Sequence, residues 1–194
     1  MKREIKEEYG IWFGRAFDGM KTIAFTLNFR QRLPGKWLPD ELTGTPVYHK
    51  PERLTEQQAL ATFKRWYNSL CRKAFGAAVA RRNRVKLQNL VVKEGKISRH
   101  DHTATQFHLH GVIEVPKGIR ADHWVAMCEA EWIGLKWADP KNHDFTKYRD
   151  AGWIEYILKG RTKEDVEDSI RLEITHLNDD VMRRLKSPAP SRLT

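Results

Sequence analysis

Large apolar side chains occupy every second position from Ile23 to Phe29, and the same period returns within residues 105–115. Side chains in a β-strand point alternately to its two faces, so this pattern predicts two half-buried strands. A third apolar run, Val85–Val92, predicts another strand. In the 105–115 strand, the residues expected to face the core are Phe107, Leu109, Ile113 and Val115.

Three other stretches have the spacing of helices. Thr55 opens the first, and Gln58 follows three residues later to complete a capping box. Asp122 is placed to cap a second helix that runs to Leu135, and a third helix is expected over Trp153–Lys159. In the first helix, one side carries Leu60, Phe63, Tyr67, Leu70 and Ala74.

The remaining segments complete the expected architecture. Residues 31–54 are rich in proline and glycine and predict a long loop, and a short strand or turn is expected near Asp144–Arg149. The order of elements predicts an α+β fold with a central antiparallel β-sheet of about five strands and helices packed on it. We expect residues 1–186 to form one domain and residues 187–194 to be a disordered tail.

Charge narrows the range of partners. Thirty-five lysines and arginines against 25 acidic residues give a formal net charge of +10. Such an excess favours a polyanion such as nucleic acid, although a generally basic protein would share it. Two cysteines are too few for a disulfide framework, and no apolar run suits a signal peptide or a membrane span. We therefore expect a cytoplasmic protein with no membrane partner.

His108 and His110 stand two positions apart in the 105–115 strand, so both imidazoles point to the same face. Two such side chains are a ready pair of ligands for a divalent cation, which can polarise a phosphate oxygen. The alternative is a pair of histidines on the solvent face of a strand with no chemical role.

Tyr156 and Lys159 lie three residues apart in the third helix, opposite a stripe formed by Trp153, Ile154, Ile157 and Leu158. A phenol needs a neighbouring cation to act as a nucleophile near neutral pH, and Lys159 can supply one. The alternative is a surface tyrosine beside an ordinary Glu155–Lys159 ion pair.

Three segments, in this order, resemble motifs of the HUH endonucleases in their replication-initiator (Rep) branch. Residues 24–29 are similar to the first motif, and Phe107-His108-Leu109-His110-Gly111 resembles the histidine–hydrophobe–histidine motif. Residues 152–159, with Tyr-x-x-Lys, resemble the third motif. The two specific motifs cover a small part of the chain.

This resemblance implies a site and a reaction. Mg²⁺ or Mn²⁺ would be held by His108, His110 and an acidic residue, for which Glu94 is our choice. Asp101 and the histidines at 100 and 102 remain alternatives. Tyr156, helped by Lys159, would attack a phosphodiester and form a 5′-phosphotyrosine link. Tyr148 is a rival nucleophile that lacks a lysine three residues later.

The implied function is site-specific nicking and joining of single-stranded DNA by a replication initiator. No phosphate-binding helicase loop occurs in the sequence, so a host helicase is a possible further partner beside the DNA or an origin hairpin. A relaxase, a transposase, a non-catalytic DNA-binding module and an unrelated RNA-binding protein are the alternatives. Trp37 and Tyr48 in the proline-rich segment are candidates either for stacking on unpaired bases or for anchoring that loop.

Overall fold

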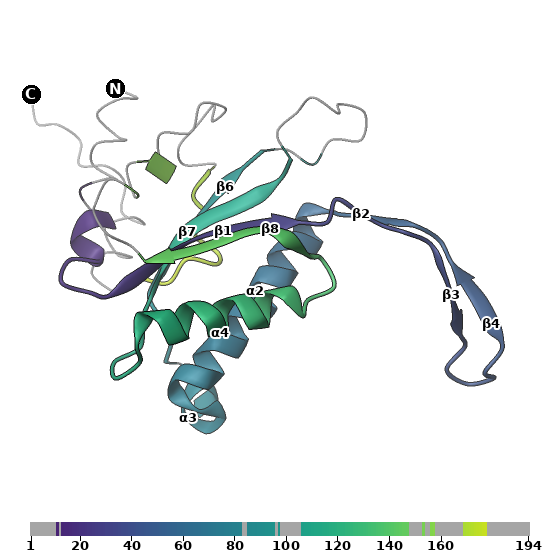
Figure 1. Cartoon of the computed structure of the whole chain (residues 1–194), viewed down its shortest axis with the longest axis horizontal. Helices are drawn as coiled ribbons and strands as arrows, with labels where there is room; N and C mark the ends of the chain where they lie inside the picture. Colours follow the sequence, from purple (N-terminus) through teal and green to yellow (C-terminus); the bar gives the residue numbers. More distant parts are fainter. Residues whose placement is uncertain are drawn as a thin grey trace, which may run out of the picture.

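The computed structural model describes residues 11, 13–82, 85–95, 97, 106–147, 153, 156–157 and 169–177. Their centre is a four-stranded antiparallel sheet in the order β6–β7–β1–β8 (Figure 1). These strands are β1 (Thr22–Phe29), β6 (Asn89–Glu94), β7 (His108–Glu114) and β8 (Ala138–Lys147). The α+β class and the antiparallel sheet are therefore confirmed. The described residues form four strands in this sheet, where about five were expected.

The position beside β6 is taken by the segment 169–177, which makes two isolated bridges with that strand. Asn89 pairs with His176, and Val92 pairs with Ile170. The backbone amides of Asn89 and His176 donate to each other's carbonyl oxygens at 2.7 and 3.0 Å. This segment therefore covers the outer edge of β6 without forming a continuous strand.

Two long helices, α2 (Glu56–Phe75) and α4 (Ala121–Ile133), cover one face of the sheet (Figure 1). The predicted capping box at the start of α2 is present, with Thr55 and Gln58 bonded reciprocally. The prediction that Asp122 caps the next helix is wrong, because α4 begins at Ala121 and its N-cap is Arg120. Asp122 instead lies in the first turn, where a carboxylate favourably meets the helix dipole. A short helix, α3 (Ala77–Arg82), follows α2.

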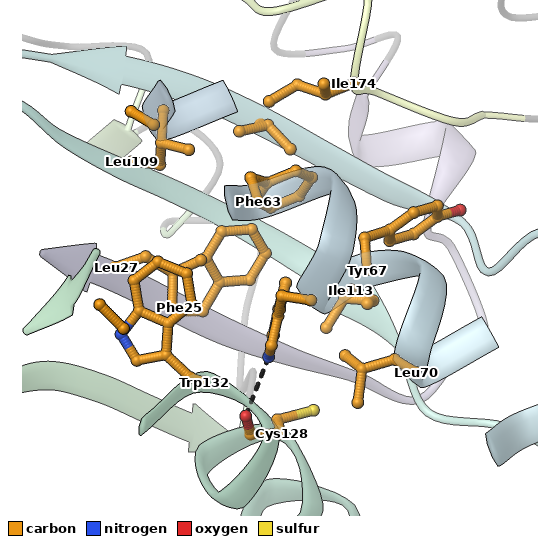
Figure 2. Packing of buried hydrophobic residues seen from close by; sticks show 14 of the residues in the cluster. Phe25, Leu27, Phe63, Tyr67, Leu70, Leu109, Ile113, Cys128, Trp132 and Ile174 are labelled. Atoms are coloured by element: carbon orange, nitrogen blue, oxygen red, sulfur yellow. Dashed lines mark hydrogen bonds between the residues drawn. The ribbon is translucent and has the colours of Figure 1, made fainter. Parts of the chain in front are cut away.

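The main core fills the space between this helical layer and the sheet. Phe25 packs edge-on against Trp66 with ring centroids 5.4 Å apart, and Trp132 lies edge-on to Phe29. The indole N–H of Trp66 donates to the Cys128 carbonyl at 2.9 Å, the dashed line that ends at Cys128 in Figure 2. The residues in β7 and directly beside it that were predicted to face the core are all buried there: Phe107, Leu109, Ile113 and Val115.

A second, smaller core lies on the opposite face of the sheet. Leu90, Val92 and Val112 present their side chains there and meet Phe13 and Ala16 from the helical turn at 13–16 and Phe17 directly after it. Ile157, Ile170 and Leu177 complete the cluster. On this face, β6 and β7 therefore carry apolar side chains at one end and polar side chains at the other.

The expected loop at 31–54 is instead a β-hairpin arm that extends away from the body (Figure 1). Its strands are β2 (Arg32–Leu33), β3 (Lys36–Pro39), β4 (Pro46–His49) and β5 (Glu52–Arg53). Strand β2 pairs with β5, and β3 pairs with β4. Pro34 and Pro51 stand between the short strands, where no ladder hydrogen bond is required. Proline therefore interrupts this hairpin without preventing it.

Three strand boundaries also differ from the predictions. Strand β6 begins at Asn89 rather than Val85, and β7 begins at His108 rather than Thr105. Strand β8 begins at Ala138, well before Asp144, although residues 138–147 have little apolar character. Pairing with β1, rather than local sequence, sets the start of β8. None of the described helices is long and apolar enough to cross a membrane.

Candidate metal centre

Glu94, His108 and His110 come together at the polar end of the second sheet face. Glu94 ends β6 directly opposite His108, the first residue of β7, and His110 follows on the same face. Glu94 Oε2 lies 3.1 Å from His110 Nε2 and 3.7 Å from His108 Nε2. All three donor atoms lie within 4.8 Å of one another. Among the described residues, Glu94 is therefore the acid that lies within reach of both histidines.

The other ring nitrogen of each histidine contacts a neighbouring oxygen. His108 Nδ1 lies 2.7 Å from the Gln106 carbonyl oxygen, and His110 Nδ1 lies 2.9 Å from Thr26 Oγ1. A carbonyl oxygen only accepts, so His108 donates from Nδ1, and the neutral ring then carries its lone pair on Nε2. This arrangement, with Nδ1 held and Nε2 directed inward, is the one that metal-binding histidines adopt.

The two Nε2 atoms are 2.9 Å apart. Two imidazole lone pairs and a carboxylate oxygen at this separation repel one another unless a proton or a metal ion lies between them. Two imidazoles with one carboxylate form a donor set suited to a divalent first-row metal. The side chains of Glu94, His108 and His110 are 25%, 13% and 9% exposed, so the cluster is partly enclosed but open to a ligand. The residues present therefore fit a metal ion.

Trp153 connects this cluster to Tyr156. The Trp153 ring is edge-on to His110 with centroids 6.1 Å apart, and its Nε1–H donates to the Gly111 carbonyl at 3.3 Å. Tyr156 stacks on the same indole at 5.1 Å and remains 60% exposed. The tyrosine thus lies one ring away from a histidine of the cluster. Ile157 is buried in the second core, as the predicted stripe requires, whereas Trp153 lies beside Tyr156 rather than opposite it.

Sequence reasoning missed the roles of Thr26 and Trp153. The alternation in β1 places Thr26 and Asn28 on the non-core face, and the register sets them beside His110 and His108. Asp144 of β8 pairs with Thr26 from the other side and extends the same polar row. The period of β1 signals that Thr26 and Asn28 face away from the core. It does not signal which strand lies next to them.

Several predicted residues lie outside the described part of the chain. Lys159 and Tyr148 are among them, and so are Asp101 and the histidines at 100 and 102. The proposed tail, residues 187–194, is likewise outside it. Their roles stay predictions.

Comparison with known proteins gave no relative: no family model, no curated protein and no solved structure matches this chain.

Proposed function

We propose that this protein is a metal-dependent endonuclease that nicks single-stranded DNA with Tyr156 as its nucleophile. The observation that carries the proposal is the juxtaposition of Glu94, His108 and His110 with Tyr156, joined through one indole ring. Metal-ligating side chains and an exposed phenol are the two parts that such a reaction requires. The resemblance of the histidine and tyrosine motifs to HUH endonucleases supports the same chemistry and an HUH-type fold.

In this proposal Glu94, His108 and His110 hold Mg²⁺ or Mn²⁺. A bound ion of this kind polarises a phosphate oxygen and stabilises the charge that develops on it. Two imidazole nitrogens favour the softer Mn²⁺ over Mg²⁺, which prefers an all-oxygen shell with several waters. Thr26 and the Gln106 carbonyl orient the two rings, so the donor atoms are preorganised rather than collected by the ligand.

Tyr156 performs the bond exchange. Its oxygen forms a bond to phosphorus as the phenolic proton leaves, and the bond from phosphorus to the 3′ oxygen breaks. The 3′ oxygen takes up a proton and becomes a free hydroxyl, while the 5′ phosphate stays on the tyrosine. Because one phosphoester replaces another, the reverse reaction joins strands. Trp153 fixes the direction of the phenol by stacking, and Lys159 is the proposed cation beside it.

The role that fits this chemistry is initiation of replication at a single-stranded site or origin hairpin in the cytoplasm, with a host helicase to open the duplex. A relaxase or transposase would use the same residues. A non-catalytic DNA-binding module would bind the same DNA without needing the histidines or a metal.

A nicking assay separates these possibilities. Single-stranded and hairpin DNA are incubated with Mn²⁺, with and without EDTA, and products are resolved on a denaturing gel. Cleavage should require Mn²⁺ and should vanish in His108→Ala and in His110→Ala. His123→Ala, a change at an exposed histidine of α4, is the matched control and should leave cleavage intact. Undiminished cleavage by a folded His108 or His110 variant would remove the ion from the mechanism. DNA binding without any cleavage would favour the non-catalytic module.

A further inference from the structure

The arm, defined as residues 32–53, presents two aromatic rings side by side on one of its faces. Trp37 of β3 pairs directly with Tyr48 of β4, and their ring centroids are 5.3 Å apart. The two residues remain 67% and 48% exposed. Large aromatic side chains at directly opposed positions of a ladder form a continuous apolar platform. Here that platform faces solvent, away from both cores.

The position of Tyr48 depends on a glycine. A Cβ built on Gly35 would lie 2.2 Å from Tyr48 Oη and 2.8 Å from Tyr48 Cζ. The phenol ring therefore lies over the bare backbone of Gly35, and any larger residue there would displace it. Contact with Gly35 on one side and Trp37 on the other holds the ring in place. The platform is thus formed in advance, which lowers the entropy cost of binding a flat ligand.

Charge along the arm is segregated. Lys36 precedes Trp37 on the opposite face of β3, Lys50 follows β4 two residues after Tyr48, and Arg32 stands nearer the body. The acids Asp40 and Glu41 stand at the tip, where Asp40 accepts hydrogen bonds from Leu42 N and Thr43 N and holds the turn. The remaining acid, Glu52, is 2.8 Å from Lys136 of the body. The surroundings of the platform are therefore basic, and the end of the arm is acidic.

The base of the arm lies beside the candidate metal centre. Asn28, near the end of β1, pairs with His108, and the arm begins four residues later. Gln31 Nε2 donates to the Phe29 carbonyl at 2.8 Å, and Leu54 N donates to the Gln31 carbonyl, so the base is fixed to the sheet. At about 3.3 Å per residue, the chain from Asn28 to Trp37 spans up to about 30 Å. The platform is therefore no farther than this from Asn28, within reach of a short extended single strand that also enters the centre.

We propose that the arm binds an unpaired stretch of DNA, with bases stacked on Trp37 and Tyr48 and phosphates beside Lys36 and Lys50. Exposed rings bordered by cations are the pattern of sequence-tolerant single-strand binding. A second copy of the chain is the other occupant considered, and the basic residues near the platform favour a polyanion instead. That the strand is DNA and continues into the metal centre rests on the proposed function; the stacking platform does not.

Equilibrium binding tests the proposal without any cleavage. Fluorescence anisotropy of a labelled single-stranded oligonucleotide, measured in EDTA, is compared with that of a fully paired duplex of the same sequence. Trp37→Ala and Tyr48→Ala should each weaken single-strand binding about thirtyfold, the middle of the range for loss of one stacked base, and should change duplex binding little. Trp37→Phe keeps a stacking face and should restore most of the affinity. Leu42→Ser, at the fully exposed tip, is the control and should bind normally.

Three results would overturn the proposal. Unchanged single-strand affinity in folded Trp37→Ala protein is the first, and an equal loss for duplex and single strand is the second. The third is a concentration-dependent dimer of the wild type that Trp37→Ala or Leu42→Ser dissociates, which would make a second copy the occupant. Thermal unfolding of each variant confirms that the body is intact. If the arm variants lose single-strand affinity while Tyr156→Phe still cleaves, the binding role of the arm is supported and the assignment of Tyr156 as nucleophile is contradicted.

Discussion

At the scale of single residues, the candidate centre depends on the second contact that each histidine ring makes, through the nitrogen that does not face Glu94. His110 presents Nε2 to Glu94 and His108, while its Nδ1 contacts the hydroxyl of Thr26 on the neighbouring strand. That contact selects one orientation of the ring, because a flipped imidazole would place a carbon against the hydroxyl. Residues that hydrogen-bond to a metal ligand affect metal affinity almost as strongly as the ligands themselves.

Thr26→Val should therefore weaken Mn²⁺ binding about 10- to 100-fold while keeping the shape of the β1 side chain. Isothermal titration of Mn²⁺ into EDTA-stripped protein measures the change. Thr22→Val is the matched control on the same strand, because Thr22 Oγ1 is buried without a hydrogen-bond partner among the described residues. Equal Mn²⁺ affinity in wild-type and Thr26→Val protein would show that this hydroxyl does not orient the ring.

The alternation within β7 was enough to predict that His108 and His110 share a face, because that property is local to one strand. Glu94 could be predicted only as one of several acids and histidines, since the choice depends on the register between β6 and β7. The contact of Thr26 with His110 joins residues 84 positions apart, and that of Trp153 with Gly111 joins residues 42 apart. No local pattern encodes such pairings, so sequence reasoning missed both.

At the scale of elements, β7 separates the core from the candidate centre. Its odd-numbered residues face α2 and α4, and its even-numbered residues face the polar cluster or the second core. Gly111 interrupts the row of large core residues because Phe25 occupies the space beneath it. A Cβ there would lie 2.2 Å from the Leu90 carbonyl oxygen and 2.3 Å from the Phe25 ring.

Gly111→Ala should destabilise the fold by about 2–3 kcal/mol, because a methyl group forced against backbone and ring must shift both strands. Chemical denaturation of the metal-free protein measures this directly. Gly134→Ala is the matched control: its φ of −75° suits alanine, and the nearest atom to the added Cβ is 3.8 Å away. That variant should be stabilised by about 0.4–1 kcal/mol. Equal stability of Gly111→Ala and wild type would contradict the close packing of Phe25 on β7.

Elements whose boundaries follow from a local sequence pattern were predicted well, and those whose boundaries follow from pairing with another strand were not. The capping box fixed the start of α2, and period-two alternation fixed β1. The hairpin arm was expected to be a loop because Pro34, Pro39, Pro46 and Pro51 normally disfavour strands. They are tolerated because β2–β5 and β3–β4 are two-stranded sheets, so each strand is an edge strand. An edge strand can hold proline because the backbone on its open side makes no ladder hydrogen bond. The start of β8 was missed because β1, rather than its own sequence, defines it.

At the scale of the whole molecule, the net charge of +10 bears on how DNA binds. If lysine and arginine contacts to phosphates supply most of the affinity, the logarithm of the binding constant should fall linearly with the logarithm of salt concentration. The slope for a single strand is about −0.7 for each phosphate neutralised. Anisotropy titrations of an unlabelled protein against labelled single-stranded DNA, at several salt concentrations, give this slope. A flat response would show that the basic excess is not the binding surface.

The central claim is that Tyr156 is the nucleophile, and the most direct measurement is the site of covalent attachment to DNA. Wild-type protein incubated with cleavable single-stranded DNA and Mn²⁺ should yield an SDS-resistant adduct that peptide mapping assigns to Tyr156. Tyr156→Phe removes one oxygen and keeps the ring that stacks on Trp153, so DNA binding should persist while cleavage and adduct both disappear. Tyr148→Phe should retain both. An adduct on Tyr148, or cleavage by water with no adduct, would contradict the assignment even with the metal requirement intact.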